Sequence, residues 1–149
     1  MPVEIKFSIL SYNVKGIKEK MKRNKIFMYV KEKIKKGIVF LQETHSVEND
    51  RNKWKKEFDG DIYLNNGTSN SKGTLIALTK DFNYEKIGYV SDDEGRIQIL
   101  SIKSDDKKYL LVNVYNENIE AKQVTLLKKI EYNASKHTRN FRIQNDNRR

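Results

Sequence analysis

The sequence predicts an α/β fold, and three observations support this prediction. Short runs of apolar and β-branched residues, of which 38–41 is the most continuous, are typical of buried strands. Apolar residues at three- and four-residue spacing within 19–36 are typical of a helix. Asn13, Glu43 and Tyr115 stand where three of the expected strands end. Because α/β folds place their chemistry at the rim of a sheet, these three side chains are candidates for one shared site.

Strands and helices alternate through the first part of the sequence. We expect strands over 5–12, 38–43 and 61–64, and helices over about 19–36 and 49–58. Two lysines followed by Gly37 indicate the end of the first helix, because a glycine after a basic last turn is a common helix C-terminus. Trp54 and Phe58 are four residues apart and mark the apolar side of the second helix.

The rest of the sequence is richer in strands. A polar, turn-rich loop over 65–73 precedes strands expected over 74–79, 84–90, 97–103 and 109–115, and then a helix over about 119–131. The polar residues between the last two strands predict a hairpin. From about residue 132 the apolar periodicity stops. We therefore expect residues 1–131 to belong to one domain and residues 132–149 to form a divergent basic tail that is disordered.

The composition favours a basic protein of one domain. With 149 residues and a net charge of +10, from 30 Lys and Arg against 20 Asp and Glu, the chain suits a polyanionic partner such as nucleic acid. The alternative explanation for the many lysines is a coding sequence that is rich in A and T. The absence of cysteine excludes disulfides, zinc–thiolate sites and thiol nucleophiles. Without a long apolar run or an apolar leader, we expect a nuclear or cytoplasmic location and no membrane partner.

Residues 15–36 carry ten basic residues against Glu19 and Glu32. Such a stretch is able to follow a DNA backbone by contacting phosphates. It fits equally well as the solvated face of a helix. Because no exposed aromatic residues are expected between the basic ones, the pattern alone does not indicate binding to single-stranded nucleic acid.

Five short motifs stand in the order and at the spacing of a known superfamily. They are Ser11-Tyr12-Asn13-Val14-Lys15-Gly16, Val39-Phe40-Leu41-Gln42-Glu43-Thr44-His45, Ser71-Lys72-Gly73-Thr74-Leu75-Ile76, Asp93-Glu94-Gly95-Arg96 and Leu111-Val112-Asn113-Val114-Tyr115-Asn116-Glu117-Asn118. With these motifs the chain resembles the endonuclease/exonuclease/phosphatase superfamily, most of all the endonuclease domain of LINE-type (non-LTR) retrotransposons. The resemblance implies a DNase-like four-layer α/β sandwich of two mostly antiparallel sheets flanked by helices, of which this chain supplies the N-terminal part.

The resemblance also assigns roles to four residues. Glu43 matches the acid that binds Mg²⁺ or Mn²⁺, and the alternative is a surface glutamate at a strand end. Asn13 is expected to hydrogen-bond the phosphate or to orient the metal-bound groups, although an Asx-turn explains it as well. Tyr115 is expected to donate to the phosphate in the transition state, and the alternative is an aromatic residue of the core. Arg96 either contacts phosphate or forms a structural salt bridge.

The family's second half should bring a Gly-Asp-Phe-Asn strand end, a later aspartate and a terminal Ser-Asp-His, and none of them occurs here. We interpret His45 as a loop residue and do not assign the role of general base to His137. The expected function is therefore that of a Mg²⁺-dependent DNA endonuclease domain, truncated and inactive in this form. The alternatives are a non-catalytic basic remnant that binds nucleic acid, and a phosphatase-type relative acting on inositol phosphates or lipid headgroups. Half of a sandwich is also expected to self-associate through its uncovered sheet face.

Overall fold

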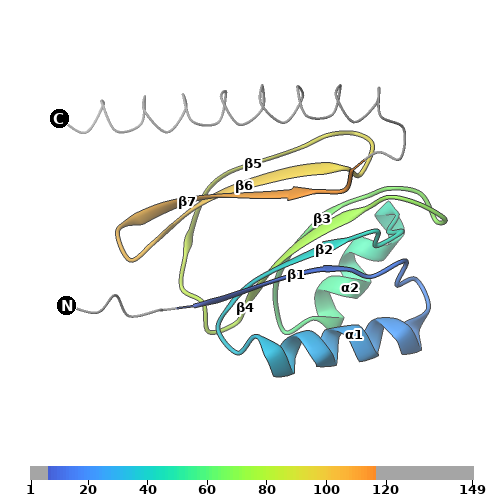
Figure 1. The fold of residues 1–149 in the computed structure, drawn as a ribbon, viewed down its shortest axis with the longest axis horizontal. Coiled ribbons are helices and arrows are strands. Elements are labelled where there is room, and N and C mark those ends of the chain that lie inside the picture. Colours follow the sequence, from blue (N-terminus) through green and yellow to red (C-terminus); the bar gives the residue numbers. More distant parts are fainter. Residues whose placement is uncertain (1–6, 117–149) are drawn as a thin grey trace.

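The computed structural model describes residues 7–116, which form two stacked sheets with two helices on the outer side of one of them (Figure 1). The first sheet and its helices comprise β1 (Ser8–Asn13), α1 (Lys20–Lys33), β2 (Gly37–Gln42), α2 (Arg51–Glu57), β3 (Gly60–Asn65) and β4 (Thr74–Thr79). The second sheet comprises β5 (Glu85–Ser91), β6 (Ile97–Ser104) and β7 (Lys107–Val114). The predicted α/β class is confirmed.

The strand order explains how the polar strand ends come together. The first sheet has the order β1-β2-β4-β3, with β1 parallel to β2 and the other pairs antiparallel. The second sheet has the order β5-β6-β7 and is antiparallel throughout. Parallel neighbouring strands need a long crossover connection, and helix α1 provides it between β1 and β2. The predicted hairpin joins β6 to β7 through Asp105 and Asp106, both at positive φ (49° and 63°) as a tight two-residue hairpin turn requires.

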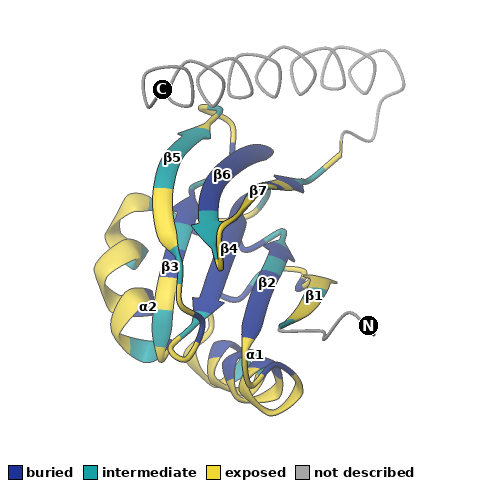
Figure 2. Cartoon of the chain, turned by 90° about the vertical axis from the view of Figure 1, so that its left-hand side faces the viewer, coloured by how far each residue is buried: buried dark blue, intermediate teal, exposed yellow. Residues whose placement is uncertain are grey.

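Burial follows the position of each strand in its sheet (Figure 2). The inner strands β2, β4 and β6 are buried along most of their length, which explains why their sequences are nearly continuous apolar runs. Strand β1 lies at the edge of the first sheet, and five of its six residues are exposed. The edge position of β1 was not evident from its sequence, which alternates like that of any half-buried strand.

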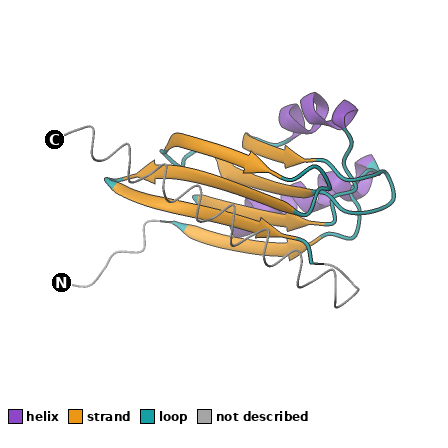
Figure 3. Ribbon diagram, turned by 90° about the horizontal axis from the view of Figure 1, so that it is seen from above, coloured by secondary structure: helices purple, strands orange, loops and turns teal. Residues whose placement is uncertain are grey.

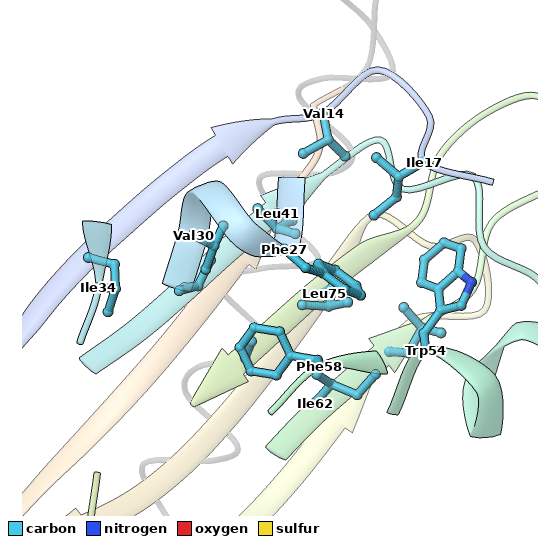
Figure 4. Packing of buried hydrophobic residues seen from close by; sticks show 13 residues of the cluster. Val14, Ile17, Phe27, Val30, Ile34, Leu41, Trp54, Phe58, Ile62 and Leu75 are labelled. Carbon is cyan, nitrogen blue, oxygen red and sulfur yellow. The ribbon is translucent and has the colours of Figure 1, made fainter. Parts of the chain in front are cut away.

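Two apolar cores hold the layers together. Between the helices and the first sheet, Trp54, Phe27 and Phe58 pack against Leu41 and Leu75 (Figure 4). Trp54 is fully buried, and removal of such a side chain costs about 3–5 kcal/mol. A second core fills the space between the two sheets and contains Ile38, Ile76, Leu78, Leu100 and Ile102.

The predicted end of the first helix is wrong. Helix α1 ends at Lys33, three residues earlier than expected, and Gly37 does not cap it. Gly37 is instead the first residue of β2, where an added Cβ would collide with the carbonyl oxygen of Ser8 on the neighbouring strand. The glycine is therefore explained by the close approach of β1 to β2.

Several expectations lie outside the described residues. These are the helix over 119–131, the domain boundary at 131 and the tail over 132–149. Within residues 7–116, neither helix is long and apolar enough to span a bilayer.

Candidate functional site

Asn13 and Glu43 are in direct contact at one edge of the first sheet. The parallel register places Asn13 opposite Gln42, so that both strands end together. The Asn13 amide Nδ2 donates to Glu43 Oε1 at 3.0 Å. The other amide atom, Oδ1, accepts the backbone N–H of Lys15 at 3.1 Å and forms an Asx-turn. The Asx-turn, which was the alternative interpretation of Asn13, is thus present together with a direct contact to Glu43.

The backbone around Glu43 is held by neighbouring loops. Glu43 has a left-handed backbone with φ 56°, a conformation that costs a residue other than glycine about 1–3 kcal/mol. Its carbonyl oxygen accepts the N–H of Gly16 at 2.6 Å. Thr44 accepts from the N–H of Ile17 at 3.1 Å and donates its own N–H to Gly73 O at 3.1 Å. Two loops that are far apart in sequence, one after β1 and one before β4, therefore fix the position of this acid.

His45 also belongs to the site, although sequence analysis treated it as a loop residue. Its Nε2 lies 3.9 Å from Glu43 Oε2, and its backbone is left-handed with φ 57°. A Cβ added to Gly16, which itself has φ +80°, would lie 2.5 Å from His45 Nδ1. Glycine at position 16 thus allows the imidazole to pack beside the acid.

A buried arginine anchors the loop that follows Asn13. Arg23 is almost completely buried and donates through Nη1 to the carbonyl oxygens of Ile17 and Lys18, at 3.2 and 2.8 Å. Its Nε and Nη2 donate to the Glu57 carboxylate. These hydrogen bonds from Arg23 hold the pKa of Glu57 below its usual range. The ion pair thus links the loop to helix α2.

Tyr115 and Arg96 form a second pair. The Arg96 guanidinium carbon lies 4.9 Å from the centre of the Tyr115 ring, which is a cation–π distance. Arg96 Nη1 donates to the carbonyl oxygens of Tyr115 and Asn116, at 3.4 and 2.9 Å, and Arg96 O accepts the N–H of Tyr115 at 2.8 Å. Arg96 is buried and makes these contacts at the end of β7, so its structural role is visible without a ligand.

A polar link between the sheets connects the two pairs. Gln42, which precedes Glu43, donates through Nε2 to Asn113 Oδ1 at 2.9 Å, and Asn113 lies two residues before Tyr115. Strands β1, β2 and β7 all end at the same side of the molecule (Figures 1 and 3). The structure therefore joins Asn13 to Glu43 directly and brings the end of β7, with Tyr115, to the same edge of the sandwich.

Asn113 and Gln98 are the residues of this region that sequence reasoning missed. The two N–H bonds of Asn113 Nδ2 are shared among three acceptors, Leu41 O and Leu75 O of the first sheet at 3.1 and 3.0 Å and Gln98 Oε1 of the second at 3.0 Å. Both amide side chains are buried. The feature of the sequence that could have identified them is an amide residue beside the apolar residues of a buried strand.

The donor set suits Mg²⁺ or Mn²⁺ with a single protein carboxylate. Among residues 7–116, no group of three or more His, Cys, Asp or Glu side chains is placed to hold a metal ion. Mg²⁺, however, often uses only one or two carboxylates and takes its other ligands from water and phosphate. The Glu43 side chain is 24% exposed, so its carboxylate is accessible for this purpose.

Comparisons with known proteins agree with this architecture. The chain is 26% identical to a 149-kDa protein of transposon TX1 from Xenopus laevis over 108 residues, which are 72% of this chain and 8% of that protein. It is similar to the crystal structure of TDP2 from C. elegans, with a TM-score of 0.60 and 20% identity over 89% of this chain and 42% of that one. A humanized D. rerio TDP2 gives a TM-score of 0.57 and 18% identity, over 80% and 56% of the two chains. No protein-family model matches the chain.

These likenesses establish the fold and a relationship to transposon-derived sequence. The fold is the DNase-like α/β sandwich of which TDP2 is an example, and the chain spans less than half of the C. elegans structure. The sequence similarity to the transposon TX1 protein covers the larger part of this chain.

Proposed function

We propose that this chain is the N-terminal part of a metal-dependent phosphodiesterase domain of the nuclease class, with DNA as its substrate. The observation that carries the proposal is the contact between Asn13 and Glu43 at the common end of two parallel strands, within a DNase-like fold. The similarity to a transposon protein and the resemblance to LINE-type endonucleases favour DNA over other phosphodiesters.

In this proposal each residue has one task. Glu43 would hold Mg²⁺ or Mn²⁺, which would supply positive charge beside the scissile phosphate. Asn13 orients the Glu43 carboxylate through its amide hydrogen bond. Tyr115 donates its phenol hydrogen bond to a phosphate oxygen, and Arg96 fixes the ring of Tyr115 from one face. Asn13 is exposed and the Glu43 side chain is partly exposed, so a phosphate is able to reach both side chains.

We further propose that the chain by itself is inactive or nearly so. Hydrolysis needs a base that deprotonates water, and a histidine oriented by an aspartate serves this purpose in many enzymes. Residues 7–116 contain one histidine, His45, and its acidic neighbour is Glu43, which is assigned to the metal. The Gly-Asp-Phe-Asn and Ser-Asp-His motifs of the resembled family are absent from the sequence.

Two measurements test the proposal separately. Binding of Mn²⁺, followed by its electron paramagnetic resonance, is expected for the unmodified chain, to be lost in Glu43→Gln and to persist in the control Glu32→Gln, an exposed glutamate on α1. Equal Mn²⁺ binding by Glu43→Gln would disprove the metal site. No nicking of supercoiled plasmid is expected with Mg²⁺ or Mn²⁺. Nicking that disappears in Glu43→Gln would overturn the proposed inactivity and support catalysis by this chain.

The phosphatase-type alternative makes a different prediction. Release of inorganic phosphate from an inositol phosphate, dependent on Glu43, would favour it over the DNA nuclease. The non-catalytic alternative is favoured by the net charge of +10 and predicts salt-dependent DNA binding that survives Glu43→Gln.

We also propose that two copies of the chain associate through the β1 side of the sandwich. Ile9 is paired in register with Ile38 of the inter-sheet core, so its side chain faces the second sheet, yet it is 60% exposed. Proline and charged residues usually protect an edge strand from pairing with another chain, and strand β1 contains neither. An edge strand that exposes Ile9 and lacks these protections is open to pairing with a second copy of the chain.

A further inference from the structure

Two exposed tyrosines lie side by side next to the candidate site. Tyr12 of β1 and Tyr29 of α1 have ring centres 6.4 Å apart with an interplanar angle of 43°, and their exposed fractions are 45% and 44%. Tyr12 is paired in register with Leu41, a residue of the core beneath the helices, so its ring lies on the helix side of the sheet. Tyr12 also directly precedes Asn13. An aromatic surface therefore begins one residue away from the proposed metal-binding pair.

Lysines flank this aromatic pair at both ends. Lys22, Tyr29 and Lys33 are separated by seven and four residues, a spacing that places them on one face of α1. Lys33 Nζ lies 5.7 Å from the centre of the Tyr29 ring. Lys22 Nζ donates to Lys15 O at 3.0 Å, in the loop that follows Asn13. The expectation that the basic segment lacks exposed aromatic residues is therefore wrong, because Tyr29 is exposed and the fold adds Tyr12 from another element.

We propose that Tyr12, Tyr29, Lys22 and Lys33, which we call the tyrosine–lysine strip, bind a single-stranded segment of nucleic acid. Aromatic side chains stack on unpaired bases of any sequence, and lysines contact the phosphates between them. In a duplex the faces of the bases are stacked on each other, so a strip of this kind favours a single strand. The proposal extends the proposed function by naming the form of nucleic acid that passes the Asn13–Glu43 pair, but binding itself requires no catalysis.

The charge of the strip favours nucleic acid over a polypeptide partner. Its two lysines belong to a chain with a net charge of +10, and the exposed aliphatic residue of β1, Ile9, points to the opposite side of the sheet. The strip is thus aromatic and basic, whereas the surface proposed for self-association is aliphatic. The two surfaces lie on opposite faces of β1 and are separable by mutation.

Fluorescence anisotropy with a labelled single-stranded oligonucleotide of about 12 nucleotides, and with its duplex, tests the proposal in the absence of metal. We expect the single strand to bind more tightly than the duplex at equal salt. Tyr12→Leu and Tyr29→Leu are each expected to weaken single-strand binding about tenfold without changing the salt slope, while Tyr29→Phe retains it. Lys22→Gln and Lys33→Gln should each reduce the salt slope by about 0.7. Lys31→Gln, an exposed lysine of α1 outside the strip, is the matched control for the slope and should leave the affinity close to that of the unmodified chain.

Three results would overturn the proposal. Equal or tighter binding of the duplex is the first, and unchanged affinity in both tyrosine variants, checked for folding by circular dichroism, is the second. The third is a loss of self-association in the tyrosine variants with unchanged oligonucleotide affinity, which would identify the strip as a polypeptide surface. Oligonucleotide binding by Glu43→Gln separates the two proposals, because its persistence after loss of Mn²⁺ binding supports the strip whether or not the chain is an enzyme.

Discussion

Replacement of Asn113 by leucine is expected to destabilise the protein strongly, because its amide is the hub of the polar link between the sheets. The side chain donates to Leu41 O, Leu75 O and Gln98 Oε1 and accepts from Gln42 Nε2. Leucine has nearly the same size, so the change removes these hydrogen bonds without opening a large cavity. The buried polar groups that Asn113 contacts then lose a hydrogen bond, and water cannot reach them to replace it.

The magnitude follows from what the partners can do next. Gln98 is fully buried, and its Nε2 already donates to Tyr63 O and to the Tyr89 hydroxyl, both at 3.0 Å. The Gln98 side chain is therefore held in place and keeps Oε1 facing leucine. One buried unsatisfied group costs about 1–3 kcal/mol. With the additional loss of the bond to Gln42, the free energy of unfolding is expected to fall by about 2–4 kcal/mol for Asn113→Leu.

Urea unfolding followed by the fluorescence of Trp54 measures this loss directly. Trp54 is the only tryptophan of the chain and is fully buried. With an m-value of about 1–3 kcal/mol/M, the midpoint is expected to fall by at least about 0.7 M. Asn70→Ala, at an exposed loop position, is the control and should change the stability by less than about 0.5 kcal/mol. Equal midpoints for Asn113→Leu and Asn70→Ala would refute the reasoning.

Three further predictions concern other parts of the structure. Gly16→Ala is expected to lower stability by more than about 1 kcal/mol, measured by the same urea assay, because φ is +80° and the new methyl group would meet the ring of His45. The Arg23–Glu57 pair lowers the pKa of Glu57, so its contribution is present above the unfolded carboxyl pKa of about 4.3 and is lost as the pH falls; the stability difference from Glu57→Gln should therefore shrink below about pH 4. Ile9→Lys is expected to shift the sedimentation profile towards the monomer, and an unchanged profile would contradict association through β1.

Much of the secondary structure was predictable because the central strands are continuous apolar runs. Strand β4 has the predicted bounds of Thr74–Thr79, and the helices α1 and α2 lie within the ranges predicted from the spacing of their apolar residues. Strand β7 begins two residues earlier than expected. Since Asp105 and Asp106 alone form the turn, Lys107 and Lys108 pair with Ser104 and Lys103 of β6.

The candidate site was predictable in part. The approach of Asn13 and Glu43 was predictable because each follows an apolar strand, and the ends of parallel neighbouring strands lie at the same side of a sheet. The structure shows their contact. The catalytic roles of these residues, of Tyr115 and of Arg96 remain predictions. The exposure of Tyr12 could not be predicted from the sequence, because it depends on the position of β1 at the edge of the sheet. The order of the strands is set by contacts between segments that are distant in sequence.

Contacts within the described part of the fold hold Asn13 and Glu43 in place. Glu43 keeps its left-handed backbone because Gly16 N–H donates to its carbonyl oxygen, and the polar link through Gln42 and Asn113 sets its strand against the second sheet. A conformation that costs about 1–3 kcal/mol persists only where its surroundings favour it. If the proposed function is correct, a bound phosphate therefore does not need to order this acid. If the proposed function is correct, what a complete site adds to this half is the group that activates water, since the positions of Asn13 and Glu43 are already determined by the fold described here.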